Sequence, residues 1–177
     1  MMSLTNRPLP TLSCGELVIR PSRAADVAPV TELLRHPAVA EWWGENTPAS
    51  VAEELVGAFT IEVAGQVAGT LHCHEEREPT YPSVAFDIAL DSALHGRGLG
   101  RRVLRMAIDE FARRGHHRFT IDPAVANQAA ISCYRAVGFK PVGILRSCER
   151  APDGSWRDGL LMDLLSWELD ERPALAE

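Results

Sequence analysis

The spacing of hydrophobic and polar residues predicts short strands that alternate with amphipathic helices. An apolar residue at every second position is typical of a half-buried strand, whereas a repeat of three to four residues is typical of a helix. The strand pattern occurs at 16–22, 59–74, 84–91, 118–122, 139–150 and 159–169. The helical pattern occurs at 24–37, at 47–57, at 103–111 with Gly115 after the last turn, and from about 128 to 137. This order of elements predicts an α+β or mixed α/β domain built on a central sheet.

Proline, threonine and glycine residues indicate where several of these elements begin and end. Pro37 is expected to close the first helix, because a proline cannot continue the backbone hydrogen bonding of a helix. Thr47 is expected to cap the second helix, with Pro48 in its first turn and Gly57 after its last. The segment 59–74 is expected to form a hairpin with its turn near 64–66.

The stretch HGRGLG, residues 95–100, places glycine at alternate positions directly before a predicted helix. Because glycine lacks a Cβ, Gly96, Gly98 and Gly100 can adopt positive φ angles and let a ligand approach the main chain. The first amides of a helix have no partner within it and the helix dipole is positive there, so this position favours an anion. The apolar face of the helix is expected to consist of Val103, Leu104, Ala107, Ile108 and Phe111.

Three arginines, Arg97, Arg101 and Arg102, add positive charge to this helix start. The spacing differs from the phosphate-binding loop GxxxxGKS/T, and it differs from the dinucleotide fingerprint GxGxxG because Arg101 or Val103 stands at its third glycine. The pattern therefore predicts an anion site of another kind. The alternative interpretation is an ordinary glycine turn that starts a helix.

Composition and charge limit the classes of function. The chain has 177 residues, of which 46% are hydrophobic and 24% charged, so we expect one globular domain over 1–177 with flexible tails at 1–14 and 170–177. A net charge of −6 argues against general binding of nucleic acid or anionic membranes and is compatible with a cationic substrate. The sequence has neither an apolar leader nor a membrane-spanning stretch, so a cytoplasmic location is expected.

The cysteines and histidines do not predict a disulfide framework or a metal centre. The four cysteines lack CxxC spacing, which favours reduced thiols. His72 and His74 would share one face of a strand, but the sequence shows no third ligand beside them. No metal is therefore expected.

Two motifs in the second half of the chain resemble those of the GNAT superfamily of N-acetyltransferases. The first is the stretch 95–100, with His95 where the family commonly has Gln or Arg, and the second is NQAAISCYRAVGF at 127–139. The resemblance implies a mostly antiparallel, twisted sheet of about six to seven strands, splayed at the middle and flanked by about four helices. It also implies transfer of an acetyl group from acetyl-CoA to an amine by direct attack in a ternary complex.

The same resemblance implies where the cofactor would bind. Main-chain amides of the glycine loop would hold the pyrophosphate, the strand before the loop would pair with the pantetheine arm, and the Asn127 helix would contact the same arm. The implied cofactor-binding residues are Ile88, Ala89, Leu90, His95, Gly96, Arg97, Gly98, Leu99, Gly100, Arg101, Asn127, Ala130 and Tyr134.

Three residues are candidates for the chemistry. An aliphatic ammonium with a pKa near 10 must lose a proton before it attacks a thioester, so a carboxylate has to assist. Asp87 is the first choice as base, because it matches the acidic residue of this strand in the family, and Asp122 would bind the ammonium. Tyr134 would protonate the departing thiolate, whose conjugate acid has a pKa near 8.5. The alternatives are a satisfied buried acid for Asp87, a loop cap for Asp122 and a core side chain for Tyr134.

A narrower resemblance points to the aminoglycoside 6'-N-acetyltransferases, with siderophore-lysine acetyltransferases as relatives. It depends on the stretches AEWWGE at 40–45, IDPAVANQAAISCYRAVGF at 121–139 and PDGSWRDGLLM at 152–162. Glu41, Trp42 and Trp43, together with Asp87 and Asp122, would then bind a cationic small-molecule amine. The alternatives are a siderophore lysine, a peptide or protein amine, or an acyl-CoA-binding module without catalysis. A homodimer is an expectation from the family resemblance alone.

Overall fold

The computed structural model describes residues 10–171, which form two compact units. The N-terminal unit comprises 10–72 and 87–99, and the C-terminal unit comprises 73–86 and 100–171. Three elements are shared between the units: β4 (Gln66–Glu76), β5 (Ser83–Leu90) and α4 (Leu99–Arg113). Residues 1–9 and 172–177, which include most of the two predicted tails, lie outside the described range.

The strands form one sheet in the order β1-β2-β3-β4-β5-β6-β8-β7. The pairs β1–β2, β2–β3, β3–β4, β6–β8 and β7–β8 are antiparallel, and β5–β6 is parallel. The sheet is therefore mostly antiparallel, as expected, with eight strands instead of six to seven. Its other strands are β1 (Leu12–Cys14), β2 (Leu17–Pro21), β3 (Phe59–Val63), β6 (Arg118–Ile121), β7 (Lys140–Arg150) and β8 (Trp156–Leu165).

The additional strand, β1, lies inside the segment predicted as a flexible N-terminal tail. Its three residues pair with Leu17–Ile19 of β2 across the turn at Gly15, whose φ is +60°. Two of the three residues of β1 are exposed, so the stretch shows no hydrophobic alternation. Backbone pairing with β2, and not burial, defines this strand, so the hydrophobic pattern of the sequence did not predict it.

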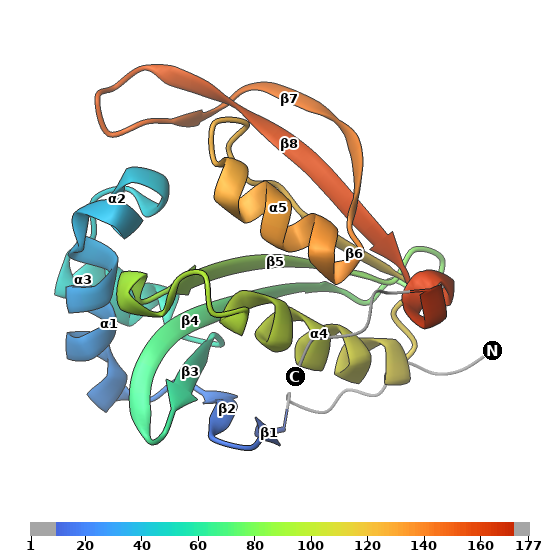
Figure 1. Cartoon of the computed structure of the whole chain (residues 1–177), viewed down its shortest axis with the longest axis horizontal. Helices are drawn as coiled ribbons and strands as arrows, with labels where there is room; N and C mark the ends of the chain where they lie inside the picture. Colours follow the sequence, from blue (N-terminus) through green and yellow to red (C-terminus); the bar gives the residue numbers. More distant parts are fainter. Residues whose placement is uncertain (1–9, 172–177) are drawn as a thin grey trace. The chain divides into compact units, whose positions relative to one another are not determined.

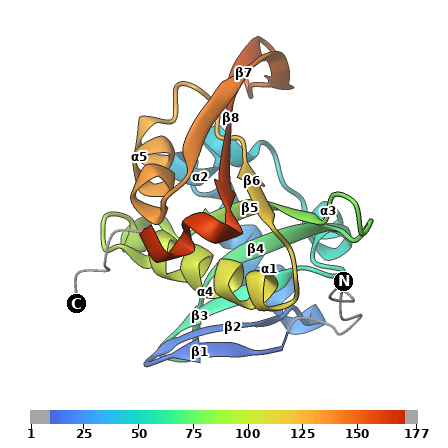
Figure 2. The ribbon, with the colours of Figure 1, turned by 90° about the vertical axis from the view of Figure 1, so that its right-hand side faces the viewer.

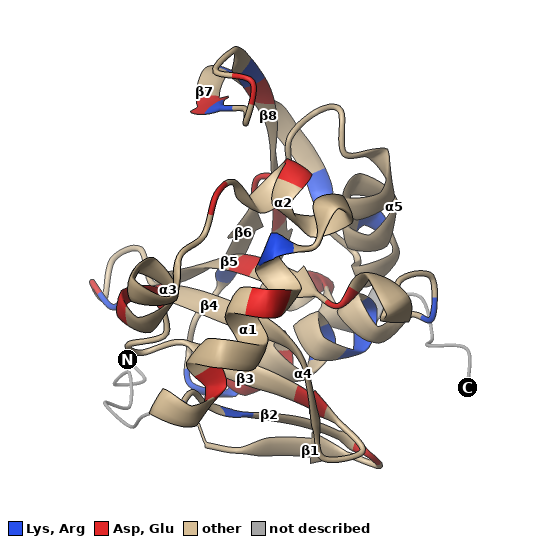
Figure 3. Ribbon diagram, turned by 90° about the vertical axis from the view of Figure 1, so that its left-hand side faces the viewer, with Lys and Arg blue, Asp and Glu red and all other residues tan. Residues whose placement is uncertain are grey.

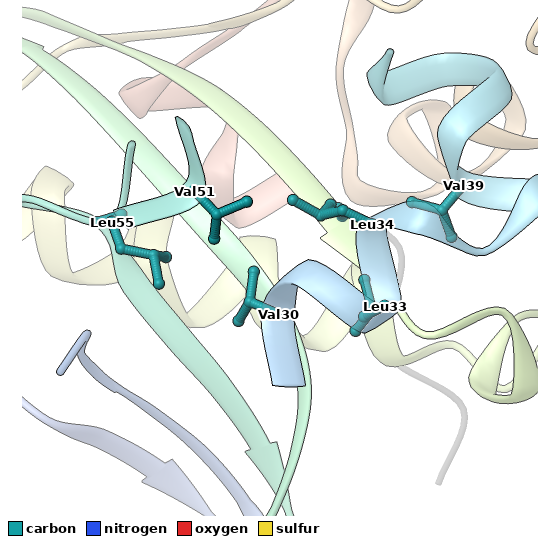
Figure 4. Close-up of a cluster of buried hydrophobic side chains, with 8 residues drawn as sticks. Val30, Leu33, Leu34, Val39, Val51 and Leu55 are labelled. Atoms are coloured by element: carbon teal, nitrogen blue, oxygen red, sulfur yellow. The ribbon is translucent and has the colours of Figure 1, made fainter. Parts of the chain in front are cut away.

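The helices of the N-terminal unit enclose a small core of their own. A 3-10 turn at Ala24–Asp26 leads into α1 (Val27–Arg35), which is followed by α2 (Pro37–Trp43) and α3 (Pro48–Glu54) (Figure 1). Figure 4 shows the apolar side chains of these helices converging. The buried cluster consists of Val30, Leu33, Leu34, Val39, Val51, Leu55, Ala58 and Ala89.

Pro37 begins a helix instead of only ending one, which corrects the sequence prediction. It occupies the first position of α2, where the missing proline N–H costs nothing and the fixed φ suits a helix. The preceding His36 has extended backbone angles, φ −61° and ψ 130°, and separates α1 from α2. The prediction for α3 is confirmed: Thr47 caps it with a 3.1 Å hydrogen bond from the Ser50 amide, and Gly57 follows with φ +81°.

The C-terminal unit contains β6, β8 and β7 together with α5 (Gln128–Val137) (Figure 2). The predicted apolar face of α4 is confirmed, because all five of its residues are at most 2% exposed. Two charged residues of α4 outside this apolar set are also buried. Glu110 pairs with Arg113 and Arg114, and Arg105 donates a 3.1 Å hydrogen bond to the Ala136 carbonyl of α5.

The end of β8 differs from the prediction of a strand through 169. The strand stops at Leu165, and Ser166–Glu171 form a 3-10 segment. Glu168 accepts a hydrogen bond from the Leu165 amide and pairs with Lys140, and the exposed Trp167 stacks on His117. These side-chain contacts favour a helical turn over continued pairing.

Candidate active site

The strand β5 carries the first group of predicted site residues. Its parallel register with β6 covers Ser83–Ala85, and the strand then continues for five residues to Leu90. Asp87 lies in this continuation and its side chain is exposed, so the alternative of a buried acid does not hold. Ile88 and Leu90 are half-buried, while Ala89 packs into the apolar cluster of the N-terminal unit.

A short 3-10 turn connects β5 to the glycine loop. The Asp91 amide donates to the Ala68 carbonyl of β4 at 2.9 Å, and the Asp91 carboxylate accepts from the Ala93 amide at 2.9 Å. The His95 ring is engaged locally, because its Nε2 lies 3.1 Å from the Leu90 carbonyl oxygen. His95 therefore stabilises the exit from β5 through its side chain.

The glycine loop has the backbone conformation that an anion cradle requires. Gly96 and Gly98 have φ angles of +75° and +72°, which side chains with a Cβ rarely adopt. Among the described residues, none of the backbone hydrogen bonds in turns, loops and caps has the amide of Gly96, Arg97 or Gly98 as its donor. A Cβ built on Gly96 meets nothing within 4 Å, so the space beside it is open. Leu99 is 7% exposed and anchors the start of α4 beneath the loop.

The two tryptophans of the N-terminal unit lie in the last turn of α2. Trp43 packs against the apolar cluster, and its ring lies 5.8 Å from the His72 ring on β4. Trp42 is half-buried and Glu41 is exposed. Trp43 therefore supports the apolar core of this unit.

The N-terminal unit also contains most of the excess negative charge. Its described residues include ten acidic and four basic side chains. Figure 3 shows acidic residues on each of its helices, and those on the helices are exposed: Glu32, Glu41, Glu53 and Glu54. This distribution makes the helical side of the unit attractive to a cation.

In the C-terminal unit, the loop that follows β6 is fastened to β8. Asp122 is exposed and stands directly after β6, and the Pro123 carbonyl accepts a 2.8 Å hydrogen bond from the Leu160 amide. Gly159 of β8 is restricted by β7 instead, because a Cβ there would lie 2.9 Å from the Cys148 Sγ but at an ordinary contact distance of 3.6 Å from the Asp122 carbonyl oxygen. The Val125 amide also donates to the Asp158 carbonyl at 2.9 Å. The backbone around Asp122 is thus well defined.

Asn127 also has a structural role that the sequence analysis did not predict. It is the N-cap of α5, and its side-chain oxygen accepts the Ala130 amide at 3.1 Å. Ala130 itself is half-buried. The carbonyl of the Asn127 side chain is therefore committed to the helix, and its amide group is the part suited to donate to a ligand.

Tyr134 lies on the buried face of α5. Only 8% of the residue is exposed, and its ring meets the Phe139 ring edge-on at a centroid distance of 6.3 Å. The packing of the ring agrees with the interpretation of Tyr134 as a core side chain. The proposed acid role depends on the hydroxyl group and not on the ring. The adjacent Cys133 is half-buried, and burial raises the pKa of its thiol, while Arg101 acts in the opposite direction.

The predicted site residues fall into two groups by unit. The N-terminal unit contains Glu41, Trp42, Trp43, the end of β5 and the loop up to Leu99, and the C-terminal unit contains Gly100, Arg101, Asp122, Asn127, Ala130 and Tyr134. Sequence reasoning missed Gly69, where a Cβ would lie 2.3 Å from the Ala89 carbonyl oxygen. The only signal in the sequence was a glycine inside a strand, which typically marks a close backbone approach.

The described residues show neither a candidate metal site nor a membrane-spanning helix. Among the described residues, no group of three or more histidine, cysteine, aspartate or glutamate side chains could hold a metal ion. None of the helices in 10–171 is both long enough and apolar enough to cross a membrane.

Comparison with known proteins identifies the family. The model of the acetyltransferase (GNAT) family matches residues 24–139, so the chain belongs to this family. N-alpha-acetyltransferase RimI of Mycobacterium tuberculosis is 36% identical over 104 residues, which span 56% of this chain and 64% of that protein. The ribosomal protein bS18 alanine N-acetyltransferase of Escherichia coli K12 is 30% identical over 122 residues, which span 69% of this chain and 80% of that protein.

The fold is shared with solved acetyltransferase structures. Mycobacterium smegmatis RimJ in complex with CoA-disulfide has a TM-score of 0.76 and 23% identity, with coverage of 86% of this chain and 83% of that one. The expected mixed α/β fold of this family is thereby confirmed.

Proposed function

We propose that this chain transfers the acetyl group of acetyl-CoA to the amine of a second substrate, with both substrates bound at once. The observation that supports it most is the loop at Gly96–Gly98. It combines two positive φ angles, uncommitted amides and an adjoining helix start. These features suit the diphosphate of coenzyme A, because oriented amides and a helix dipole stabilise an anion without a metal. Membership of the acetyltransferase family supports the same ligand.

The remaining cofactor contacts follow along the chain. The part of β5 beyond its register with β6 would pair with the pantetheine arm through the main chain of Ile88–Leu90. The side-chain amide of Asn127 would donate to the same arm, since its oxygen is used by Ala130. Arg97 is exposed and Arg101 half-buried, so either guanidinium could neutralise phosphate charge.

The proposed chemistry assigns the proton transfers to two side chains. Asp87, exposed on β5, would accept the proton of the acceptor ammonium directly or through a water, and Asp122 would attract the ammonium. The freed amine then attacks the thioester carbonyl, so that a C–N bond forms as the C–S bond breaks. Tyr134 would give its phenolic proton to the departing thiolate, and the second proton that the nitrogen loses on becoming an amide would return to the phenolate.

The acceptor is better described as a protein amine than as an aminoglycoside. The Escherichia coli relative is named as an alanine N-acetyltransferase of ribosomal protein bS18, and the Mycobacterium tuberculosis relative is named as an N-alpha-acetyltransferase. We therefore propose the N-terminal amine of a basic polypeptide, drawn to the acidic helices of the N-terminal unit and to Glu41 and Trp42. An aminoglycoside is the second candidate, because a tryptophan beside acidic groups also suits an aminated sugar.

Thiol release during acetyl transfer tests the reaction and the acceptor together. The protein is mixed with acetyl-CoA and, separately, with a basic peptide that has a free N-terminal alanine, the same peptide with a blocked N-terminus, several aminoglycosides and lysine derivatives. We expect release with the free peptide and none with its blocked control. Release with aminoglycosides alone would favour the second candidate. Tight coenzyme A binding with no release for any amine would indicate a binding module instead of an enzyme.

A further inference from the structure

The turn between β5 and the glycine loop is joined to a helix far away in sequence. The Ser92 hydroxyl oxygen lies 3.1 Å from Nδ1 and 3.5 Å from Nε2 of His36, 56 residues earlier, and both residues belong to the N-terminal unit. Ser92 follows the predicted pantetheine-binding residues of β5, and the loop of Gly96–Gly98 begins four residues later. The contact therefore holds the chain between the two parts of the proposed cofactor site.

His36 has a second contact that ties it to the start of α2. Its Nδ1 lies 3.4 Å from the Ala38 amide and accepts that hydrogen bond as the N-cap of the helix. The Ser92 hydroxyl can donate to the same nitrogen, so the Ala38 amide and Ser92 share the single lone pair of Nδ1, and the neutral ring has its proton at Nε2. The imidazole thus joins two backbone segments: the turn that leads into the glycine loop, and the helix that ends in Trp42 and Trp43.

We propose that His36 and Ser92 are positioning residues that couple the coenzyme A loop to α2. This inference rests on the proposed function, because it concerns how that same site is held. The hydrogen bond limits the freedom of the turn before the loop, so less ordering remains to be done when the diphosphate binds. The same contact transmits a conformational change of the loop to the tryptophans of α2. The affinity for the cofactor and the affinity for the acceptor therefore affect each other reciprocally.

A double-mutant cycle on coenzyme A affinity measures the link without an acceptor. Calorimetry compares wild type, His36→Ala, Ser92→Ala and the double variant. Each single change is expected to raise Kd roughly two- to tenfold, the range for one hydrogen bond. The double variant is expected to bind no more weakly than the weaker single variant. Ser92→Thr, which keeps the hydroxyl, should restore most of the affinity, and His36→Asn, which can cap α2 but is too short to reach Ser92, should not.

The cap of the neighbouring helix provides a matched control. Thr47→Ala removes a cap hydrogen bond from α3 just as His36→Ala removes one from α2, and it leaves the Ser92 contact intact. We expect Thr47→Ala to lower the melting temperature with little effect on the Kd for coenzyme A. If Thr47→Ala weakens binding as much as His36→Ala does, general loss of stability explains the result and the link is rejected.

Tryptophan fluorescence reports on the second half of the proposal. Replacing the exposed Trp156 and Trp167 by phenylalanine leaves Trp42 and Trp43 as the only tryptophans of the chain. Coenzyme A is expected to change their emission, and Ser92→Ala is expected to remove most of that change at saturating coenzyme A. Two results would overturn the proposed link and leave the proposed function standing. One is that the effects of the two single variants on Kd are additive, and the other is that the emission change remains in Ser92→Ala. Wild-type protein that binds no coenzyme A would overturn the proposed function as well.

Discussion

At the residue scale, the strongest electrostatic feature is a buried ion pair in the N-terminal unit. Arg20 contacts both carboxylate oxygens of Asp26, at 2.7 and 2.8 Å, and reaches Glu62 at 2.6 Å. Asp26 also accepts from the Thr60 hydroxyl and the Arg23 amide. The hydrogen bond from Arg20 is the main cause that lowers the pKa of Asp26 from 3.8 to about 2.

This pKa predicts how stability depends on acid. A carboxyl group whose pKa is lower in the folded state stabilises the fold above its unfolded pKa, and the contribution is lost as pH falls through the folded value. We expect the free energy of unfolding to fall by about 2 kcal/mol between pH 5 and 2 through Asp26. Urea denaturation at a series of pH values measures it. Asp26→Asn should be less stable than wild type at pH 7, and its free energy of unfolding should depend less steeply on pH. If it depends on pH as steeply as that of wild type, Asp26 is not the group responsible.

A buried histidine in the C-terminal unit predicts a second dependence, at higher pH. His116 is 1% exposed and packs against Phe111, and its Nε2 lies 3.2 Å from the Glu75 carboxylate without the alignment of a hydrogen bond. Burial is the main cause that lowers the pKa of His116 below 6.5.

Because the neutral ring is favoured in the folded state, stability is retained above the unfolded pKa and decreases as pH falls below it. NMR titration of the imidazole resonances is expected to show a titration midpoint below 6.5 for His116, whose signal is identified by its loss in His116→Gln. A titration midpoint above 6.5 for His116 would contradict the desolvation argument.

The proposed acid, Tyr134, allows a sharp test because its hydroxyl can be removed without loss of the ring. Tyr134→Phe keeps the packing against Phe139, so the melting temperature should change little. The turnover rate is expected to fall roughly 10- to 10⁴-fold if the phenol protonates the thiolate. An unchanged rate at unchanged stability would remove Tyr134 from the chemistry and leave it as a core residue.

At the element scale, local signals in the sequence predicted the regular parts well. The five apolar residues of α4 and the bounds of α5 agree with the structure, because a repeating face is recorded in the sequence itself. The exceptions depend on neighbours. Helix α2 begins at Pro37, a residue type that cannot continue a preceding helix, and β1 is defined only by its partner β2. Arg105 and Glu110 look solvent-facing in the sequence but are buried through polar contacts.

Gly69 of β4 supplies a prediction at this scale. A Cβ at this position would lie 2.3 Å from the Ala89 carbonyl oxygen and 2.9 Å from a Leu90 methyl carbon, so β4 must move or β5 must shift its end. Gly69→Ala is expected to lower the free energy of unfolding by about 1–3 kcal/mol, the usual cost of overpacking. It should also weaken coenzyme A binding, because Ile88–Leu90 would be displaced.

Gly143 of β7 is the matched control for this substitution. A Cβ there meets nothing within 4 Å, and its φ is not in the positive range. Gly143→Ala should therefore change the free energy of unfolding by less than about 0.5 kcal/mol, since surface substitutions rarely do more. Chemical denaturation of both variants makes the comparison, and equal effects would show that the close approach at Gly69 is unimportant.

At the scale of the whole molecule, the sequence predicted two features of the candidate site, but it predicted neither where the acidic charge gathers nor the contact of His36 with Ser92. The glycine loop and the Asn127 helix could be found because their residue types and order are specific. The acidic bias was visible only as a net charge of −6, and the structure concentrates it in the N-terminal unit. The contact of His36 with Ser92 could not be foreseen, because no local pattern links residues that far apart.

The central claim is that the amides of the glycine loop bind the diphosphate of coenzyme A. Calorimetric titration of the wild-type protein with coenzyme A and with pantetheine, which lacks the diphosphate and the nucleotide, tests it most directly. The account predicts that coenzyme A binds more tightly by on the order of 100-fold or more, the effect of losing several charge-assisted hydrogen bonds. Equal affinity for the two compounds would contradict it.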